Sequence, residues 1–316
     1  MLDHTDVQFE EVLTKEAIAL LEDRNDFAVV NGAIPLIFTD KINGTYKKYS
    51  ADDMRRRSIA ERAGGEEFAK FQMALEDLAF HCKQQGSEFR LDDRDQVEGA
   101  LEDMGKKMVE DAFANYDIKL ANLMVAGKFG TDIQGDNTAT TGKVLKWTNA
   151  NSDPVADIED AKDKISAKLG VEPDTLIITR DVFKALKKNA NIKGLLRDTT
   201  DRIVTLDKLA ELFDLRNVYV LNATATTTNR GQADQKIERV ASGKALLYYR
   251  GTAEGALIPS TVKAFAYDGK IGRATKGIGL QTYRMEVITA DIIRVVQDFE
   301  VVIEIKDGGA LFYDIV

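Results

Sequence analysis

WTNANSDPVADIEDAKDKISAKLGVEPDTLIITRDVFKALKKNANIKGLLRDTTDRIVTLDKLAELFDLRNVYVL, residues 147–221, is the stretch that decides the fold. It predicts a helix, a proline turn, a buried strand, two helices and a second buried strand. Asp153 and Pro154 suit a helix cap followed by a first-turn proline. The expected elements are helices over residues 155–169, 182–188 and 206–213 and strands over residues 175–179 and 218–221. Alternating strands and helices of this size predict a compact α/β lobe.

The composition is that of a folded, acidic protein. The 316 residues are 44% hydrophobic, which is enough for two or three lobes with real cores. Lys and Arg number 43 against 52 Asp and Glu, giving a net charge of -9. Such a balance disfavours wrapping nucleic acid, because affinity for phosphates comes from Lys and Arg. An ordinary acidic protein fits the charge equally well.

Several sequence features bear on where the chain works. Cys82 is the single cysteine, so an intramolecular disulfide and a multi-cysteine zinc site are excluded and a reducing compartment is expected. The first residues lack a basic segment followed by an apolar run, so no signal peptide is predicted. No window approaches eighteen consecutive apolar residues, so we expect no membrane span. Synthesis in a cytoplasm is the default expectation.

The N-terminal part predicts an arm followed by a sheet edge. Apolar residues at helical spacing predict a short helix from about Thr14. Strands are predicted over residues 27–30 and 34–38, and Pro35 favours a sheet edge for the second. Asn43–Gly44 indicates a turn.

A long hairpin is predicted beyond that turn. Its two extended arms contain Tyr46 and Tyr49 on one side and residues 75–83 on the other. The stretch between them includes Arg55–Arg57 and a glycine pair at residues 64–65, with little to bury. A hairpin of this kind cannot form its own core and normally lies on something else.

Residues 91–126 predict the clearest long helix. Apolar residues from Val97 to Leu123 step by three or four, and Gly127 is a plausible end. At ~1.5 Å per residue, the helix would be roughly 50 Å long. Carboxylates near a helix N-terminus favour the helix dipole, which suits Asp92, Asp93 and Asp95. Residues 130–146 are polar and glycine-bearing and predict a loop.

The C-terminal part is predicted to be mainly β. A loop is expected over residues 224–235, a strand over 244–249, and strands with a glycine-basic turn over 262–283. Apolar residues alternate with charged ones from Phe299 to Ile305. Asp307–Gly309 predicts a hairpin turn into an apolar last strand, residues 310–316.

The motifs that suggest catalysis fail on inspection. His81 and Cys82 are adjacent on a predicted strand and point to opposite faces, so they would not act together. Ser242–Lys244 lacks the upstream glycine and the following helix of a phosphate-binding loop. A calcium loop that begins at Asp132 lacks ligands at its third and twelfth positions. We therefore predict no catalytic residue, no cofactor and no metal site. An acidic α/β enzyme with a carboxylate-metal or nucleotide site stays an alternative, because carboxylate-only sites would be invisible among 52 acids.

Residues 173–186 and 209–220 resemble the major capsid proteins of tailed phages, and so do residues 243–248 and 307–312. That family builds icosahedral shells on the Hong Kong phage capsid fold. The resemblance implies an α+β fold with an N-terminal arm, a long β-hairpin loop, a peripheral domain with a spine helix and sheet, and a compact α/β axial domain. The implied ranges are the arm at 1–28, the extended loop at 29–90, the peripheral domain at 91–135 and 286–316, and the axial domain at 136–285.

The resemblance implies a structural function. Copies would self-assemble through pentamers and hexamers into an icosahedral virion shell around double-stranded DNA, and assembly would take place in the host cytoplasm. Expected partners are other copies of the chain, a separate scaffolding protein, a portal and, as an optional partner, a decoration protein. DNA would be touched only non-specifically, and a membrane is not expected. A related alternative is an encapsulin-type shell that stores cargo enzymes.

The resemblance also points to contacts between subunits, because the extended loop would lie across a neighbour. A solvated face is the default interpretation of Arg55, Arg56 and Arg57. The alternative is that they pair with the Asp92–Asp95 end of another subunit's long helix, because arginine forks suit carboxylates. The predicted interface residues are Arg55, Arg56, Arg57, Glu66, Glu67, Lys70, Asp92, Asp93 and Asp95. Some members of the family crosslink a loop lysine near the position of Lys70, but no residue pattern here predicts that reaction.

Overall fold

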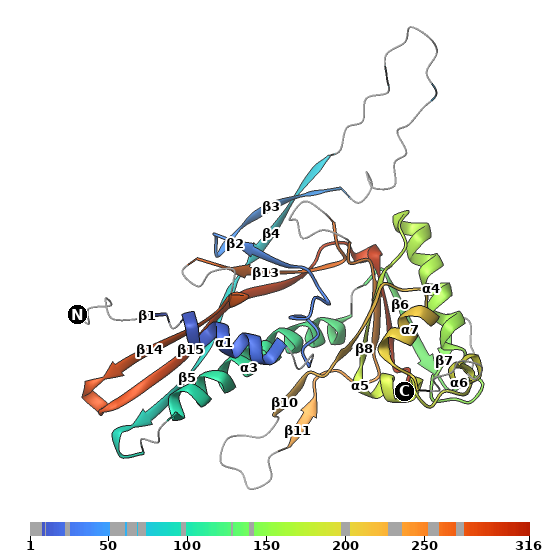
Figure 1. The fold of residues 1–316 in the computed structure, drawn as a ribbon. Helices are drawn as coiled ribbons and strands as arrows, with labels where there is room; N and C mark the ends of the chain where they lie inside the picture. Colours follow the sequence, from blue (N-terminus) through green and yellow to red (C-terminus); the bar gives the residue numbers. More distant parts are fainter. Residues whose placement is uncertain are drawn as a thin grey trace.

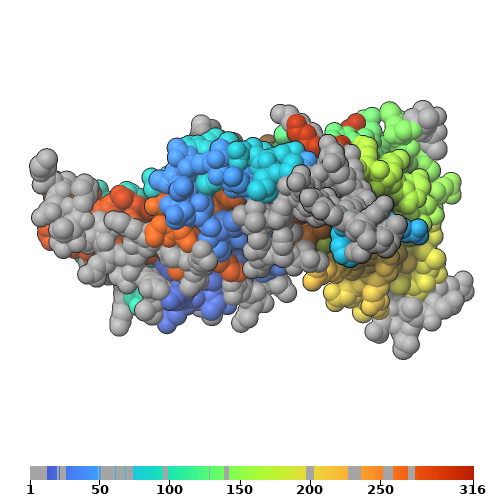
Figure 2. All heavy atoms as spheres, turned by 90° about the horizontal axis from the view of Figure 1, so that it is seen from above, coloured from blue at the N-terminus to red at the C-terminus, as the bar shows by residue number. Residues whose placement is uncertain are grey.

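The computed structural model describes most of the chain. The described residues are 8–9, 11–22, 26–50, 61, 68, 74–95, 99–127, 129–138, 142–196, 203–226, 236–251, 259–269 and 275–316. Two six-stranded sheets form two lobes, and a two-stranded hairpin projects away from both (Figure 1). Viewed from above, the molecule is elongated, with the second lobe at one end (Figure 2).

The first lobe is a mainly antiparallel sheet in the order β1-β14-β15-β13-β2, with β5 also paired to β15. Its strands are β1 (Gln8–Phe9), β2 (Leu36–Thr39), β5 (Lys83–Asp92), β13 (Val262–Tyr267), β14 (Ile278–Met285) and β15 (Ala290–Ile303). The long strand β15 organises this lobe, because β14, β5 and β13 all pair with it. Leu36–Thr39 forms an edge strand just after Pro35, as the sequence predicts.

Helices α1 (Glu11–Glu22) and α3 (Ala100–Ala126) pack side by side against this sheet (Figure 1). The 27 residues of α3 correspond to about 40 Å of helix. Its buried stripe includes Phe113, Tyr116 and Leu120, all fully buried, at the three- and four-residue spacing that keeps side chains on one face. The ring of Tyr116 lies 4.2 Å from that of Phe299 on β15, so α3 and the sheet share one core.

The second lobe is a mixed sheet in the order β7-β6-β16-β12-β8-β9. Its strands are β6 (Thr131–Asp136), β7 (Lys143–Leu145), β8 (Thr175–Thr179), β9 (Asn217–Leu221), β12 (Ala245–Tyr248) and β16 (Gly309–Tyr313). Four helices pack on it, α4 (Pro154–Leu169), α5 (Arg180–Leu186), α6 (Ala190–Leu195) and α7 (Leu206–Leu212). The predicted cap of α4 is confirmed, since the Asp153 carboxylate accepts the N–H groups of Val155 and Ala156, both at 3.2 Å.

The two lobes share a core because the second sheet is apolar on both faces. Leu176, Ile178 and Leu247 pack under the helices of the second lobe. Their neighbours Ile177 and Leu246 point the other way, into the core that contains α3 and the first sheet. Successive side chains on a strand alternate between faces, so one strand serves both cores. The apolar runs Leu176–Ile178 in β8 and Ala245–Leu247 in β12 fit this burial on both faces.

Two short hairpins complete the chain. Strands β3 (Asn43–Tyr49) and β4 (Leu75–His81) pair in antiparallel register from Asn43↔His81 to Tyr49↔Leu75, which confirms the predicted arms. They project from the first lobe (Figure 1) and their atoms lie over part of its sheet in Figure 2. Strands β10 (Thr224–Thr226) and β11 (Ile237–Arg239) form the other hairpin, where the sequence predicts only a loop.

The predicted start of the long helix is wrong. Residues 83–92 form strand β5, Asp93–Asp95 form a 3-10 turn, and α3 begins at Ala100. Strand β5 pairs with β15 over ten residues, from Asp92↔Ala290 to Lys83↔Phe299. The hydrogen bonds of this ladder fix the segment as a strand, and its partner lies about 200 positions away, out of reach of local periodicity.

Other local predictions also fail for lack of long-range information. Residues 27–30 form a turn instead of a strand, and Asn43–Gly44 lies inside β3 instead of in a turn. The predicted loop at 130–146 contains β6 and β7, because main-chain groups there pair with β16. Helix α6 is not among the predicted elements.

The predicted C-terminal hairpin is wrong as well. Asp307 and Gly308 lie in a 3-10 turn, but β16 does not fold back on β15. It crosses to the second sheet and pairs with β12 and β6. In the same way β13 and β14 belong to the first sheet, although they fall within the predicted axial range 136–285. The strands of the two sheets are therefore interleaved along the chain.

Candidate assembly interface

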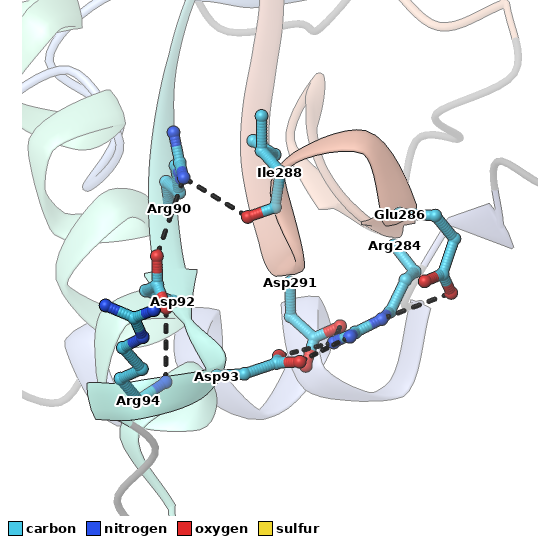
Figure 3. Close-up of polar contacts among 8 residues, drawn as sticks. All are labelled: Arg90, Asp92, Asp93, Arg94, Arg284, Glu286, Ile288 and Asp291. Carbon is cyan, nitrogen blue, oxygen red and sulfur yellow. Dashed lines mark hydrogen bonds and ion pairs between the residues drawn. The ribbon is translucent and has the colours of Figure 1, made fainter.

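The far end of the first lobe carries a charged cluster (Figure 3). Asp92 ends β5, Asp93 opens the 3-10 turn, and Arg284 and Asp291 lie on the neighbouring strands β14 and β15. These residues meet because β5 and β14 end, and β15 begins, at the same end of the sheet. We call this cluster, with Glu286, the charged tip.

Arg284 is the centre of the charged tip. Its Nη1 and Nη2 donate to the two carboxylate oxygens of Asp93 at 2.7 and 2.6 Å, a bidentate pair. Nη1 also donates to Asp291 at 3.1 Å, and Nε donates to Glu286 at 3.3 Å. The hydrogen bonds from Arg284 hold the pKa of the Asp93 carboxyl below its usual value. Asp93 is therefore already engaged within its own chain.

Asp92 is held more loosely. Its carboxylate accepts the N–H of Arg94 at 3.2 Å and lies 3.6 Å from Nη2 of Arg90. The same Nη2 of Arg90 donates a hydrogen bond to the carbonyl of Ile288 at 3.3 Å (Figure 3). The contacts of Asp92 are therefore longer than the bidentate pair that Arg284 forms with Asp93.

The remaining predicted interface residues cannot be placed against this tip. Arg55–Arg57, Glu66, Glu67 and Lys70 lie outside the described residues, and so does the side chain of Asp95. Asp92 and Asp93 are the members of the predicted set whose side chains the structure describes, and both lie at this tip. The structure also corrects their setting, because they lie at the end of β5 and not in the first turn of α3.

Exposed apolar side chains are a feature that sequence reasoning missed. Val287 is 91% exposed at the turn between β14 and β15, beside the charged tip. Ile203, before α7, and Ile237, on β11, are 72% and 70% exposed. Apolar side chains exposed singly are common on protein surfaces, so these three residues by themselves do not define an interface. The sequence signal is slight, a single apolar residue among polar neighbours.

The root of the hairpin is a buried ionic cluster. Lys263 on β13 and Glu304 just after β15 form an ion pair at 2.8 Å, with 1% and 0% of their side chains exposed. Glu304 also accepts the N–H of Ser260 at 3.0 Å. From β3, Lys48 Nζ donates to the Glu304 carbonyl at 3.1 Å, so the hairpin is tied to this pair.

Aromatic packing surrounds that ion pair. Tyr46 and Phe80 of the hairpin contact Phe265 of β13, with ring centroids 4.5 and 5.0 Å away. Burial, and secondarily the charge of Glu304, raise the pKa of Tyr46 well above its usual value. Burial lowers the pKa of Lys263, while its bond to Glu304 opposes that shift. Cys82 is buried in the same cluster and His81 is exposed, as their predicted alternation requires.

Within the described ranges, no three His, Cys, Asp or Glu side chains are grouped so as to hold a metal ion. None of the described helices combines the length and apolar character needed to cross a bilayer. What the structure offers instead is an elongated body, a projecting hairpin and scattered exposed apolar residues.

Comparison with known families identifies this architecture. The family model described as phage major capsid protein E matches residues 105–273, more than half of the chain. The chain belongs to this family of phage major capsid proteins. A curated relative, the major capsid protein of Burkholderia phage BcepMu, is 24% identical over 195 residues. That match covers 59% of this chain and spans 61% of the relative's length.

Solved structures show the same fold over 90–98% of this chain. A phage-related protein from Bordetella bronchiseptica is 18% identical, with a TM-score of 0.70 and 98% of each chain covered. The virus-like particle from Pyrococcus furiosus matches with a TM-score of 0.54 at 10% identity, over 95% of this chain and 98% of that one. The capsid structure of the cyanophage P-SCSP1u matches with a TM-score of 0.53 at 10% identity, over 90% of this chain and 87% of that one. The fold is therefore the α+β fold of phage capsid proteins.

Proposed function

We propose that this chain is the subunit of an icosahedral phage shell that encloses double-stranded DNA. The observation that carries the proposal is the match of residues 105–273 to the phage major capsid protein E family. The projecting hairpin, with few buried side chains along β4, supports a contact between chains. The encapsulin alternative has less support, because the family match and the curated relative both belong to phage capsid proteins.

In this proposal the work of the chain is mechanical and involves no catalysis. The compact second lobe would lie near the centre of each pentamer or hexamer, and the first lobe would lie at its periphery. The N-terminal arm and the extended loop would clasp neighbouring subunits. Further partners would be a separate scaffolding protein, a portal and a decoration protein. With a net charge of -9, the shell would touch packaged DNA only non-specifically. Assembly would take place in the host cytoplasm, and the product would be the virion shell.

Electron microscopy of the purified chain, alone and with its scaffolding protein, tests the assembly. Closed shells, tubes, or free pentamers and hexamers are the expected products. A chain that stays monomeric or dimeric with its scaffolding protein, and that binds a nucleotide or a metal ion, would overturn the proposal. Packaged DNA against packaged protein cargo distinguishes a phage shell from an encapsulin.

We further propose that Arg55–Arg57 of one chain contact Asp92 of another, since Arg284 already holds Asp93. Replacing all three arginines with glutamate is expected to raise the critical concentration for assembly about fivefold. Loss of one surface pair with Asp92, at roughly 0.5 kcal/mol, and a new repulsion of similar size sum to about 1 kcal/mol, which is about a fivefold change in an equilibrium constant. Light scattering as a function of protein concentration measures the critical concentration for assembly.

The matched control is the triple lysine variant, which keeps the charge but loses the fork. It should assemble at a concentration between those of the wild type and the glutamate variant. Adding Asp92→Arg to the glutamate variant should recover part of the loss. Assembly of the glutamate variant at the wild-type concentration would remove the contact from the proposal.

A further inference from the structure

The turn at residues 27–33 lies at the junction of the two lobes and holds its own shape. Its main chain is closed by bonds from Asn31 N to Phe27 O, from Gly32 N to Val29 O and from Ala33 N to Ala28 O, at 2.9–3.2 Å. Gly32 has a φ of 90°, a backbone conformation that favours glycine. The turn is therefore a compact unit that neighbouring elements can hold by hydrogen bonds.

Three separate elements hold this turn. From α3, the carboxylate of Asp117 accepts the N–H groups of Ala28 and Val29 at 3.0 and 2.9 Å. From the second sheet, the hydroxyl of Tyr248 on β12 donates to the carbonyl of Ala33. From the segment before β14, Lys276 Nζ donates to the carbonyl of Val30 at 3.2 Å. One short turn thus joins the spine helix, the first sheet and the second sheet.

Asp117 is the unusual member of this set. Its side chain is 2% exposed and is surrounded by the shared apolar core. Its hydrogen-bond partners are main-chain N–H groups, which stabilise a carboxylate but carry no formal charge. Among the described residues, the charged or phenolic groups on the surrounding elements include Asp26, Tyr116, Lys119, Tyr219, Glu238, Arg239, Tyr248, Arg250 and Lys276. Lys276 approaches the turn at Val30, Arg250 and Tyr219 approach it at Gly32, and Lys119 is exposed.

We propose that Asp117 makes this turn a proton-linked clasp between the two lobes, closed when its carboxyl is protonated and loosened when it is ionised. An ionised carboxylate prefers water to a buried site with dipolar partners alone. Local opening of the turn would give the charge that water, whereas the neutral acid can stay buried with its carbonyl oxygen still accepting a main-chain N–H. The clasp is a property of one chain and does not depend on the proposed assembly.

The pKa of Asp117 supports this direction. Burial raises it to about 7, against the two hydrogen bonds that lower it. A carboxyl whose pKa is raised in the closed state favours that state fully below its ordinary value of 3.8, and the advantage is lost as pH rises to about 7. The clasp should therefore loosen through the mildly acidic range and change little above neutral pH.

Hydrogen exchange of the purified protein, followed by mass spectrometry between pH 5 and 8, tests the clasp. The probe is a peptide covering the turn, and a peptide from β8 is the reference. After correction for the intrinsic rate, the opening constant of the turn should rise about tenfold per pH unit between pH 5 and 6.5 and level off above pH 7. A flat profile in the wild type would overturn the proposal without any variant.

Two variants distinguish the effect of Asp117 protonation on the turn from the effect of losing another contact that holds it. Asp117→Asn is nearly isosteric and neutral at every pH, so its profile for the turn should be flat. Tyr248→Phe removes a different anchor of the same turn, and its opening constant should be higher at every pH with the wild-type slope retained. A wild-type slope in Asp117→Asn would show that another group titrates, and the assignment to Asp117 would be wrong.

Discussion

Glu304→Ala is expected to destabilise the hairpin root by about 3–5 kcal/mol, because removal of one partner of a buried ion pair is strongly destabilising. Lys263, whose side chain is 1% exposed, would lose its 2.8 Å ion pair. The substitution also removes the acceptor of the Ser260 N–H. Urea unfolding followed by circular dichroism should show a lower midpoint, and proteolysis within the hairpin should be faster than in the wild type.

A double variant provides the control for this loss. Lys263→Met with Glu304→Leu replaces both charges by apolar groups of similar size, an exchange that is often neutral or stabilising in other proteins. We expect its unfolding free energy to lie within about 1–2 kcal/mol of the wild type. If Glu304→Ala and the double variant lose the same amount, packing and not charge pairing holds the root together.

Trp147→Ala is expected to cost the second lobe about 3–5 kcal/mol, the usual range for deleting a buried aromatic side chain. Trp147 is fully buried, and its ring lies 5.4 Å from that of Phe312 on β16. Its indole Nε1 donates to the carboxylate of Asp157 on α4 at 2.9 Å. The residue therefore ties α4 to the last strand of the chain. Circular dichroism during urea unfolding measures the loss, since Trp147 is the sole tryptophan and its fluorescence disappears in the variant.

Trp147→Phe is the matched comparison. It keeps an aromatic ring against Phe312 but removes the donor to Asp157, whose pKa is already raised by burial to about 6. Loss of that hydrogen bond should raise the Asp157 pKa further and cost less than the alanine variant, about 1–3 kcal/mol. Equal losses in the two variants would show that the hydrogen bond, and not the volume of the ring, carries the stability.

The elements between residues 153 and 179 in the second lobe were predictable from the sequence because their signals are local. The Asp153–Pro154 cap, the 3.6-residue pattern of α4 and the apolar run of β8 each lie within one element, and the structure confirms all three. The spine helix was also predictable as an element, since its buried stripe repeats over several turns. Of the candidate interface, the sequence could supply charged residue types but not their neighbours, as the pairing of Asp93 with Arg284 shows.

What the sequence by itself determined is therefore the set of buried faces, together with the family resemblance that the comparisons confirm. Tertiary structure alone decided which strands pair. Strand β5 pairs with β15, which lies about 200 positions later in the chain, and β16 pairs with β12 of the second sheet instead of with β15. It also decided that residues 27–30 turn around the carboxylate of Asp117. The physical reason is that periodicity reports which side of an element is buried, whereas main-chain partners and buried charges are satisfied by groups far away in the chain.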